Sequence, residues 1–212
     1  FAPPALAVLL CLAGLSLALS LFLRWPGGSP AGALGSTLSG TFYVGIPMAF
    51  LPLLRGVGDR VPGVAEMGPW VPMAFVLFPL LVTWAGDTAA YLVGNAVGRR
   101  KLAPTVSPGK SVEGALGGVL GSVGAAVLVA HLWLTGLASG GVSLATAAWM
   151  GAVLAVGTQV GDLVESVLKR EAGVKDSGRL LPGHGGFLDR LDALLWAFPL
   201  TWAMLAAVGG LP

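Results

Sequence analysis

The 212-residue sequence contains few charged residues, and this scarcity excludes most classes of soluble protein. Only 10% of its residues are Asp, Glu, Lys or Arg, whereas a soluble domain has roughly a quarter. Hydrophobic side chains make up 55% of the chain, and the mean hydropathy is +0.84. This composition excludes a disordered chain, a coiled coil and an ordinary soluble domain. It leaves a protein with several membrane-spanning segments.

Cysteine and histidine are almost absent as well. The single cysteine, Cys11, excludes an internal disulfide and a cysteine-based zinc site, and its place in an apolar run indicates packing. The two histidines, His131 and His184, are far apart in the sequence, so no zinc site is expected. Glycines flank His184 on both sides, one before it and two after it. They indicate either a backbone that turns tightly around a ligand or a plain turn.

Long apolar runs are abundant. A membrane-spanning helix needs about 20 mostly apolar residues, and six segments qualify. The sequence therefore predicts an all-α fold, a polytopic transmembrane helix bundle with about six spanning helices in a single integral-membrane domain, residues 1–212. The segments are Ala5–Leu23, Ala31–Leu54, Trp70–Gly94, Gly114–Leu134, Ser143–Leu168 and Asp189–Val208.

The basic residues predict how these helices are oriented. Ten of the 12 Lys and Arg residues fall in the odd-numbered loops, so the positive-inside rule places those loops in the cytoplasm and both chain ends outside. A chain that begins outside at Phe1 fits an N-terminal truncation that has removed upstream helices. In the fourth segment, Gly114, Gly117, Gly118 and Gly121 form a stripe of small residues that predicts close packing against another helix.

Five acidic residues lie in or at the ends of the apolar segments, where ionisable groups are costly and usually functional. Within two pairs, Asp162 with Glu165 and Asp189 with Asp192, the residues are three apart and share a helix face; the fifth acid is Asp87. All five lie toward the predicted cytoplasmic side. Carboxylate oxygens suit Mg²⁺ or another hard cation, although ion pairs with neighbouring Arg and Lys remain an alternative.

Basic and hydroxyl side chains surround these acids. Together they could hold phosphate groups and the magnesium that accompanies them. Gly109-Lys110-Ser111 looks like the end of a phosphate-binding P-loop, but Pro104 stands where that loop requires a glycine. The set comprises Lys169, Arg170, Lys175 and Arg179 after the fifth segment, and Ser107, Lys110 and Ser111 before the fourth.

Three stretches closely resemble the signature of the phosphatidate cytidylyltransferase (CDP-diacylglycerol synthase) family: Ser166–Arg170, Val174–Gly178 and Pro182–Asp192. The stretches Trp84–Tyr91 and Ser107–Gly114 also look like that family. The resemblance covers roughly residues 81–195. It marks these residues as the catalytic region, with 1–80 as lipid-facing and packing helices and 196–212 as the rest of the last helix.

The resemblance implies transfer of CMP from CTP to phosphatidate, giving CDP-diacylglycerol and pyrophosphate. It implies Asp162 and Asp189 as metal ligands, Mg²⁺ as cofactor and a second cation such as K⁺. It also implies a lipid bilayer as surroundings, a bacterial inner membrane with the site on the cytoplasmic side, no nucleic acid, and a homodimer as a candidate assembly. The implied catalytic set adds Lys169, Arg170, Lys175, Asp176 and His184, and the implied substrate-binding set is Asp87, Ser107, Lys110, Ser111, Glu165, Arg190 and Asp192.

Three alternatives stay open. A related CTP-dependent membrane enzyme acting on an ether lipid or a polyprenol would share the carboxylates. A cation-coupled transporter would need acids near the middle of the membrane and often paired repeats. A structural or lipid-binding membrane protein would function without CTP.

Overall fold

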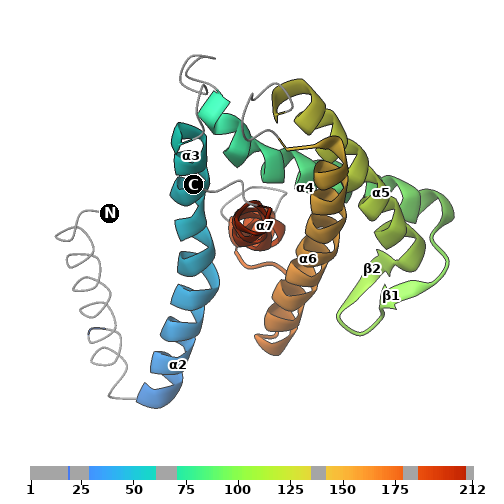
Figure 1. Cartoon of the computed structure of the whole chain (residues 1–212). Coiled ribbons are helices and arrows are strands. Elements are labelled where there is room, and N and C mark those ends of the chain that lie inside the picture. Colours follow the sequence, from blue (N-terminus) through green and yellow to red (C-terminus); the bar gives the residue numbers. More distant parts are fainter. Residues whose placement is uncertain (1–18, 20–28, 61–70, 135–141, 179–185, 209–212) are drawn as a thin grey trace. The chain divides into compact units, whose positions relative to one another are not determined.

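The computed structural model describes Leu19 and residues 29–60, 71–134, 142–178 and 186–208, and this part of the chain is helical apart from one β-hairpin (Figure 1). The chain divides into two compact units, Phe1–Ile46 and Pro47–Pro212. In the first unit, helix α2 (Pro30–Gly40) begins after Ser29, whose hydroxyl accepts the Gly32 N–H at 3.1 Å. A short π-helix, η1 (Thr41–Gly45), follows it.

The second unit contains the remaining elements. Helix α3 (Ile46–Arg60) leads into it, and long helices alternate with short connections after that. In chain order these elements are α4 (Val71–Val97), β1 (Lys101–Ala103), β2 (Ser107–Ser111), α5 (Val112–Val129), η3 (Ala130–Leu134), α6 (Leu144–Glu171) and α7 (Leu188–Ala207).

Four helical stretches are long and apolar enough to cross a membrane: Leu34–Val57, Met73–Val97, Val112–Trp133 and Leu144–Glu171. They coincide with the second to fifth predicted segments, which confirms the all-α, polytopic membrane fold. The first predicted segment lies outside the described residues except for Leu19. The sixth corresponds to α7, a helix that is not among the four candidate spans because charged residues fill its first turn. The count of six is therefore not confirmed.

Helices α4 and α5 pack closely along the predicted glycine stripe. A Cβ atom added at Gly121 would overlap the Ala89 side chain, and one added at Gly114 would lie 2.9 Å from the Ala90 carbonyl oxygen. The Ser122 hydroxyl donates to the Val82 carbonyl oxygen, at 3.3 Å. The stripe is thus confirmed as a packing surface for α4.

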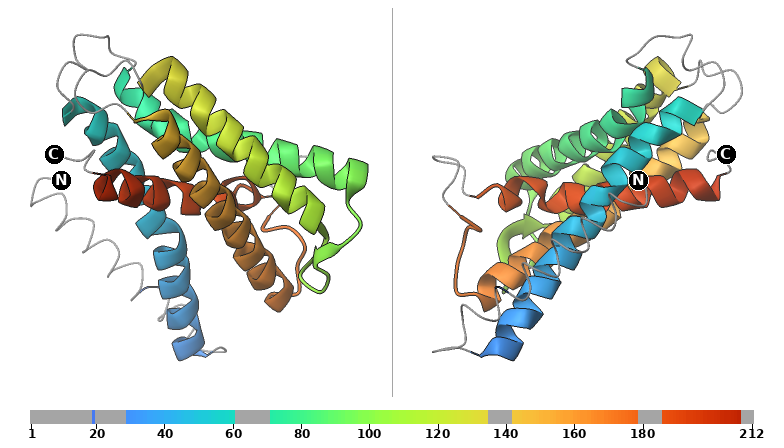
Figure 2. Two further views of the ribbon diagram at one scale, coloured as in Figure 1. Left: turned by 45° about the vertical axis from the view of Figure 1, so that its right-hand side comes forward. Right: turned by 90° about the vertical axis from the view of Figure 1, so that its left-hand side faces the viewer.

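The antiparallel hairpin β1–β2 joins α4 to α5, in a region that the sequence analysis treated as a loop. Glu113, in the first turn of α5, accepts the backbone N–H groups of Arg99 and Arg100 at 3.0 and 3.2 Å. These bonds hold the end of α4 beside the start of α5. The hairpin therefore projects from the end of the helix pair where the basic residues of this connection gather (Figure 2).

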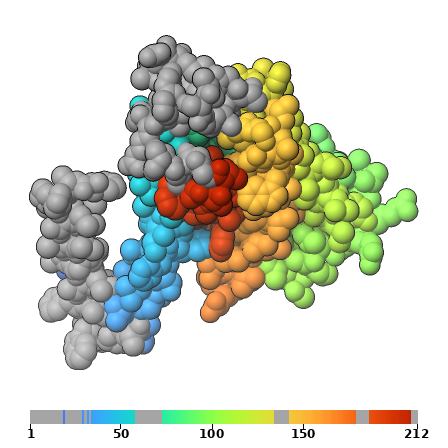
Figure 3. Space-filling view, in the orientation of Figure 1, coloured from blue at the N-terminus to red at the C-terminus, as the bar shows by residue number. Residues whose placement is uncertain are grey.

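Helix α7 lies across α6 rather than along it, since α7 is seen end-on in Figure 1 while α6 runs down the page. Gly161 of α6 allows this crossing, because a Cβ there would overlap the indole ring of Trp196. Trp202 of α7 also packs edge-on against Phe50 of α3, with ring centroids 5.5 Å apart. In Figure 3 the side chains of α7 fill the space beside α6. Their crossing places the first turn of α7 beside the last turns of α6.

Candidate functional site

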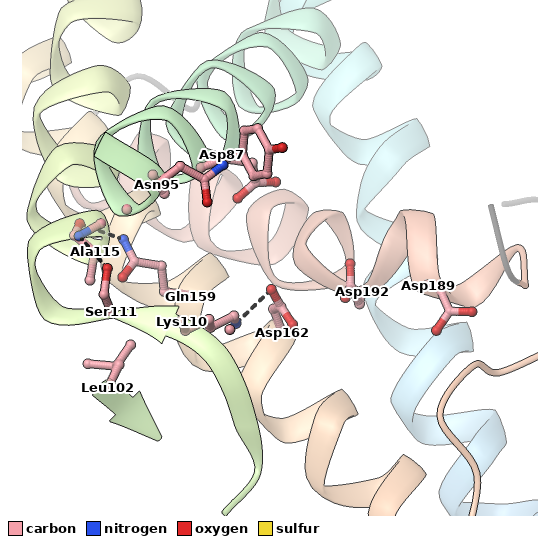
Figure 4. A pocket seen from close by; sticks show the side chains of 15 residues that line it. Asp87, Asn95, Leu102, Lys110, Ser111, Ala115, Gln159, Asp162, Asp189 and Asp192 are labelled. Atoms are coloured by element: carbon pink, nitrogen blue, oxygen red, sulfur yellow. Dashed lines mark hydrogen bonds and ion pairs between the residues drawn. The ribbon is translucent and has the colours of Figure 1, made fainter. Parts of the chain in front are cut away.

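A cavity of about 510 Å³ opens where the second half of α4, the hairpin, the start of α5, the second half of α6 and the start of α7 meet (Figure 4). These elements are far apart in the sequence, and the antiparallel order of the helices brings their ends together. Five charged residues line the cavity: Asp87, Lys110, Asp162, Asp189 and Asp192. All five belong to the sets that the sequence analysis selected.

Lys110 of β2 reaches across the cavity to Asp162 of α6. Its Nζ atom lies 2.6 Å from Asp162 Oδ2, and the side chains are 25% and 36% exposed. Ser166, one turn further along α6, places its hydroxyl 3.5 Å from the other oxygen of Asp162. The hairpin thus supplies a cation to the carboxylate that begins the acidic face of α6.

A second lysine, Lys169, lies between two carboxylates. Its Nζ atom contacts Glu165 one turn earlier on α6 and lies 2.7 Å from Asp189 Oδ1 of α7. The Glu165 side chain is only 1% exposed, so the charge of Lys169 compensates a buried carboxylate. The ion pairs that the sequence left open as an alternative are therefore present.

Asp189 binds more donors than Lys169 alone. Its Oδ2 atom accepts the Ser177 N–H and hydroxyl, both at 2.9 Å, and the Gly186 N–H at 2.7 Å. Burial acts to raise the pKa of Asp189, which lies outside the four candidate spans, but the hydrogen bonds from Lys169, Gly186 and Ser177 outweigh it and hold that pKa well below its usual range. Asp189 is therefore an anion that binds Lys169 of α6 and the backbone of Ser177 and Gly186, which lie between α6 and α7.

The chain can return to Asp189 because α6 ends in a tight reversal. Gly173 has a φ of +69°, a left-handed conformation that glycine adopts without strain. The Gly173 N–H donates to Arg170 O at 3.0 Å, and the Val174 N–H donates to Lys169 O at 2.9 Å. This pair of bonds is a Schellman motif, and it turns the chain back so that Ser177 reaches the first turn of α7.

The other predicted site residues have varied surroundings. Ser111 lines the cavity and caps α5 by accepting the Gly114 N–H at 3.1 Å. The guanidinium of Arg170 donates to Val106 O at 3.4 Å, which ties α6 to the hairpin. Ser107, Lys175, Asp176 and Arg190 do not line the cavity, and all but the half-buried Ser107 are exposed. Arg179 and His184 lie outside the described residues.

The sequence analysis missed three polar residues that line the cavity: Tyr91, Asn95 and Gln159. A signal for each was present. Tyr91 and Asn95 follow Asp87 at intervals of four, and Gln159 precedes Asp162 by three, so each shares a helix face with a predicted site residue. The sequence analysis assigned no role to these three residues, because it did not extend the helix faces of the predicted acids to their neighbours.

The carboxylates provide oxygen ligands of the type that Mg²⁺ prefers. Asp87, Asp162, Asp189 and Asp192 come from three helices and line one cavity. Among the described residues, however, no three acidic, histidine or cysteine side chains lie close enough together to hold a metal ion. The donors thus fit a hard cation in kind, while Lys110 and Lys169 neutralise two of them in this arrangement.

The fold and the site define an integral membrane protein with a charged cavity at one end of its helix bundle. The chain belongs to the cytidylyltransferase family, whose model matches residues 7–208. It is 40% identical over 185 residues to a phosphatidate cytidylyltransferase of Brucella suis, covering 87% of this chain and 60% of that protein. A protein of the same name from Staphylococcus epidermidis is 41% identical over 170 residues, covering 77% of this chain and 55% of that protein.

The chain thus spans about three fifths of the length of the curated relatives that it matches. A solved structure described as an intramembrane enzyme for archaeal membrane lipid biosynthesis is 25% identical, with a TM-score of 0.42, covering 59% of this chain and 77% of that one.

Proposed function

We propose that this chain transfers CMP from CTP to the phosphate of phosphatidate, producing CDP-diacylglycerol and pyrophosphate. The observation that carries the proposal is the cavity, where carboxylates from α4, α6 and α7 face Lys110 in one space. The relatives that are about 40% identical to this chain over the aligned stretch bear the name of that activity. Cytidylyl transfer needs such a mixture, because two polyanions must be held together.

The reaction requires no nucleophilic side chain. An oxygen of the lipid phosphate attacks the α-phosphorus of CTP, and the bond from that phosphorus to the β-phosphate oxygen breaks to release pyrophosphate. Because the attacking oxygen is already anionic, positioning and charge neutralisation are the main contributions of the protein. Lys110 lines the cavity and Lys169 contacts Asp189 at its edge, so both can pair with phosphate oxygens; Arg170 follows Lys169 on α6, and Lys175 lies just after that helix.

We further propose that Asp162 and Asp189 bind Mg²⁺, with Asp87, Glu165 and Asp192 beside them. A bound Mg²⁺ would neutralise charge on the triphosphate. Asp189 already accepts three donors through Oδ2 and Lys169 through Oδ1, so it would have to release the Lys169 ammonium to bind an ion. The K⁺ and homodimer predictions rest on the resemblance alone.

The proposed location is a bacterial inner membrane with the cavity on the cytoplasmic side. Arg99 and Arg100 follow the end of α4, Lys101 begins β1, and Lys169 and Arg170 lie in the last turn of α6. Positive residues concentrate on the cytoplasmic side of membrane proteins. Soluble CTP would enter from there, and the lipid phosphate would be available at the same interface.

The test is pyrophosphate release by the purified protein with phosphatidate, Mg²⁺ and each of the four ribonucleoside triphosphates, with mass spectrometry of the lipid product. We expect release with CTP and formation of CDP-diacylglycerol. Parallel reactions with an ether-lipid phosphate or a polyprenyl phosphate distinguish the related enzymes. An Asp162→Asn variant should be inactive, whereas Glu171→Gln, which removes an exposed carboxylate from the same helix, should be active. No release with phosphatidate would refute the proposal.

A further inference from the structure

The cavity has two chemically different ends. Figure 4 shows Asp162, Asp192 and Asp189 at one end and Ser111, Gln159 and Asn95 at the other, with Lys110 between them; Asp87 lies next to Asn95. A nucleoside triphosphate has the same division, because its base is neutral and its phosphates are charged. If the triphosphate occupies the end with the lysine and the carboxylates, the base lies at the end with the neutral polar side chains.

The structure fixes the orientation of the Gln159 amide at this end of the cavity. Its Nε2 atom donates to the Ala115 carbonyl oxygen of α5 at 3.2 Å. A carbonyl oxygen can only accept, so this bond assigns the nitrogen to the α5 side of the amide and leaves Oε1 as the remaining face. Within the described part of the chain, Oε1 accepts no hydrogen bond. Gln159 therefore offers the cavity an acceptor that cannot turn into a donor without losing its bond to α5.

A fixed acceptor distinguishes pyrimidine bases. Cytosine carries an amino group at C4, which donates, whereas uracil has a carbonyl oxygen at that position, which accepts. Opposite Oε1, cytosine would form a hydrogen bond and uracil would place two acceptors against each other. Purine bases are larger than pyrimidine bases. At this end of the cavity the backbones of α4 and α5 lie close together at Gly94 and Gly114, which favours the smaller base.

We propose that Gln159 is the residue that selects cytosine, by accepting a hydrogen bond from the 4-amino group of CTP. This inference rests on the proposed function, because it assigns the base of the same nucleotide to one end of the cavity. The lysines can only donate, and the proposed function assigns the carboxylates, which could also accept from an amino group, to the metal and the phosphates.

The experiment removes the amino group and the acceptor separately. Binding of CTP, UTP and the triphosphate of 2-pyrimidinone riboside, which is CTP without its 4-amino group, is measured by titration calorimetry on the purified chain with Mg²⁺. The same three ligands are measured with Gln159→Met. The matched control is Thr158→Val, the buried neighbour on α6 whose hydroxyl donates to Leu154 O at 2.8 Å and which does not line the cavity.

We expect the original chain and Thr158→Val to bind CTP at least about tenfold more tightly than the other two ligands, since one such base contact is worth roughly tenfold or more. Gln159→Met should bind all three ligands with similar affinity, because it loses affinity for CTP alone. Equal binding of CTP and its des-amino analogue by the original chain would overturn the inference, and so would undiminished selectivity in Gln159→Met. The analogue comparison on the original chain decides the matter if Gln159→Met does not fold.

This outcome is separable from the proposed function. Selective binding of CTP without pyrophosphate release in the presence of phosphatidate would refute the transfer reaction and leave the role of Gln159 standing. Pyrophosphate release from CTP and UTP at equal rates and equal affinities would do the reverse.

Discussion

Replacing Asp162 or Asp189 by asparagine tests two different roles. We expect Asp162 to act in substrate binding alone, and Asp189 to stabilise the fold as well. Each substitution keeps the shape of the side chain and removes one negative charge. The two residues differ in their partners: among the charged groups that the structure describes, Asp162 pairs with Lys110 alone, whereas Asp189 accepts from Lys169, Ser177 and Gly186. The expected losses of stability differ accordingly.

For Asp189→Asn the loss follows from the donors around the carboxylate. In the best orientation the amide oxygen replaces Oδ2 and keeps the bonds from Ser177 and Gly186, and the NH₂ group then faces the Lys169 ammonium at the position of Oδ1. The variant loses a hydrogen bond between charged groups and places two donors together, which costs about 2–3 kcal/mol. For a chain of this size that loss lowers the unfolding temperature by roughly 4–12 °C.

For Asp162→Asn the loss is smaller, because its ion pair with Lys110 is partly exposed, with 36% and 25% of the two side chains accessible. Such pairs contribute about 0–1 kcal/mol. Both variants should lose turnover a hundredfold or more, about 3 kcal/mol of transition-state stabilisation, if both carboxylates bind the metal.

The assay is thermal unfolding in detergent alongside pyrophosphate release, with Glu171→Gln as the control for loss of an exposed charge. We expect Asp162→Asn to be inactive and nearly as stable as the original chain, and Asp189→Asn to be inactive and less stable. Equal unfolding temperatures for the two variants would refute the role of Asp189 in holding the connection. Near-normal turnover in Asp162→Asn would refute its place in the site.

Three other predictions concern packing, topology and metal. Gly121→Ala should lower the unfolding temperature because its Cβ overlaps Ala89, at a cost of about 1–3 kcal/mol, whereas Gly124→Ala, which faces open space, should be neutral or slightly stabilising; equal effects would contradict the α4–α5 contact. A cysteine at the exposed Thr105, in a Cys11→Ala background, should react with an impermeant thiol reagent in inside-out membrane vesicles but not in intact cells. Excess EDTA should abolish pyrophosphate release, and added Mg²⁺ should restore it; full turnover in EDTA would exclude a metal.

The helices were predictable because their apolar runs are long and uninterrupted. The runs that became α4, α5 and α6 were located to within a few residues, and the glycines of α5 correctly indicated a close neighbour. The hairpin was not predicted, since β1 and β2 are three and five residues long and show no alternation of apolar and polar side chains. The bonds from the Arg99 and Arg100 N–H groups to Glu113, which hold the two ends of the connection together, are not visible in any local sequence pattern either.

The sequence allowed us to predict which kinds of residue form the site, but not which residues contact one another there. Asp87, Asp162 and Asp192 were selected because they are acidic residues in apolar segments, and all three line one cavity. The attachment of Ser177 to Asp189 could not be predicted, because it depends on the left-handed turn at Gly173 and on a backbone N–H, and backbone donors leave no trace in a sequence. Gln159 was overlooked because its meaning depends on which face of α6 meets α5.

The ion pairs explain how a helix bundle with so few charged residues can hold so many acids near one another. A carboxylate in a membrane segment is costly unless a cation accompanies it, and here Lys110 and Lys169 accompany Asp162, Glu165 and Asp189. The same two lysines are those proposed to hold phosphate. A lysine that turns toward a phosphate releases its carboxylate, and a cation that arrives with the triphosphate can replace it. Binding of nucleotide and metal should therefore be mutually dependent, since either one alone would leave a charge in the cavity without a partner.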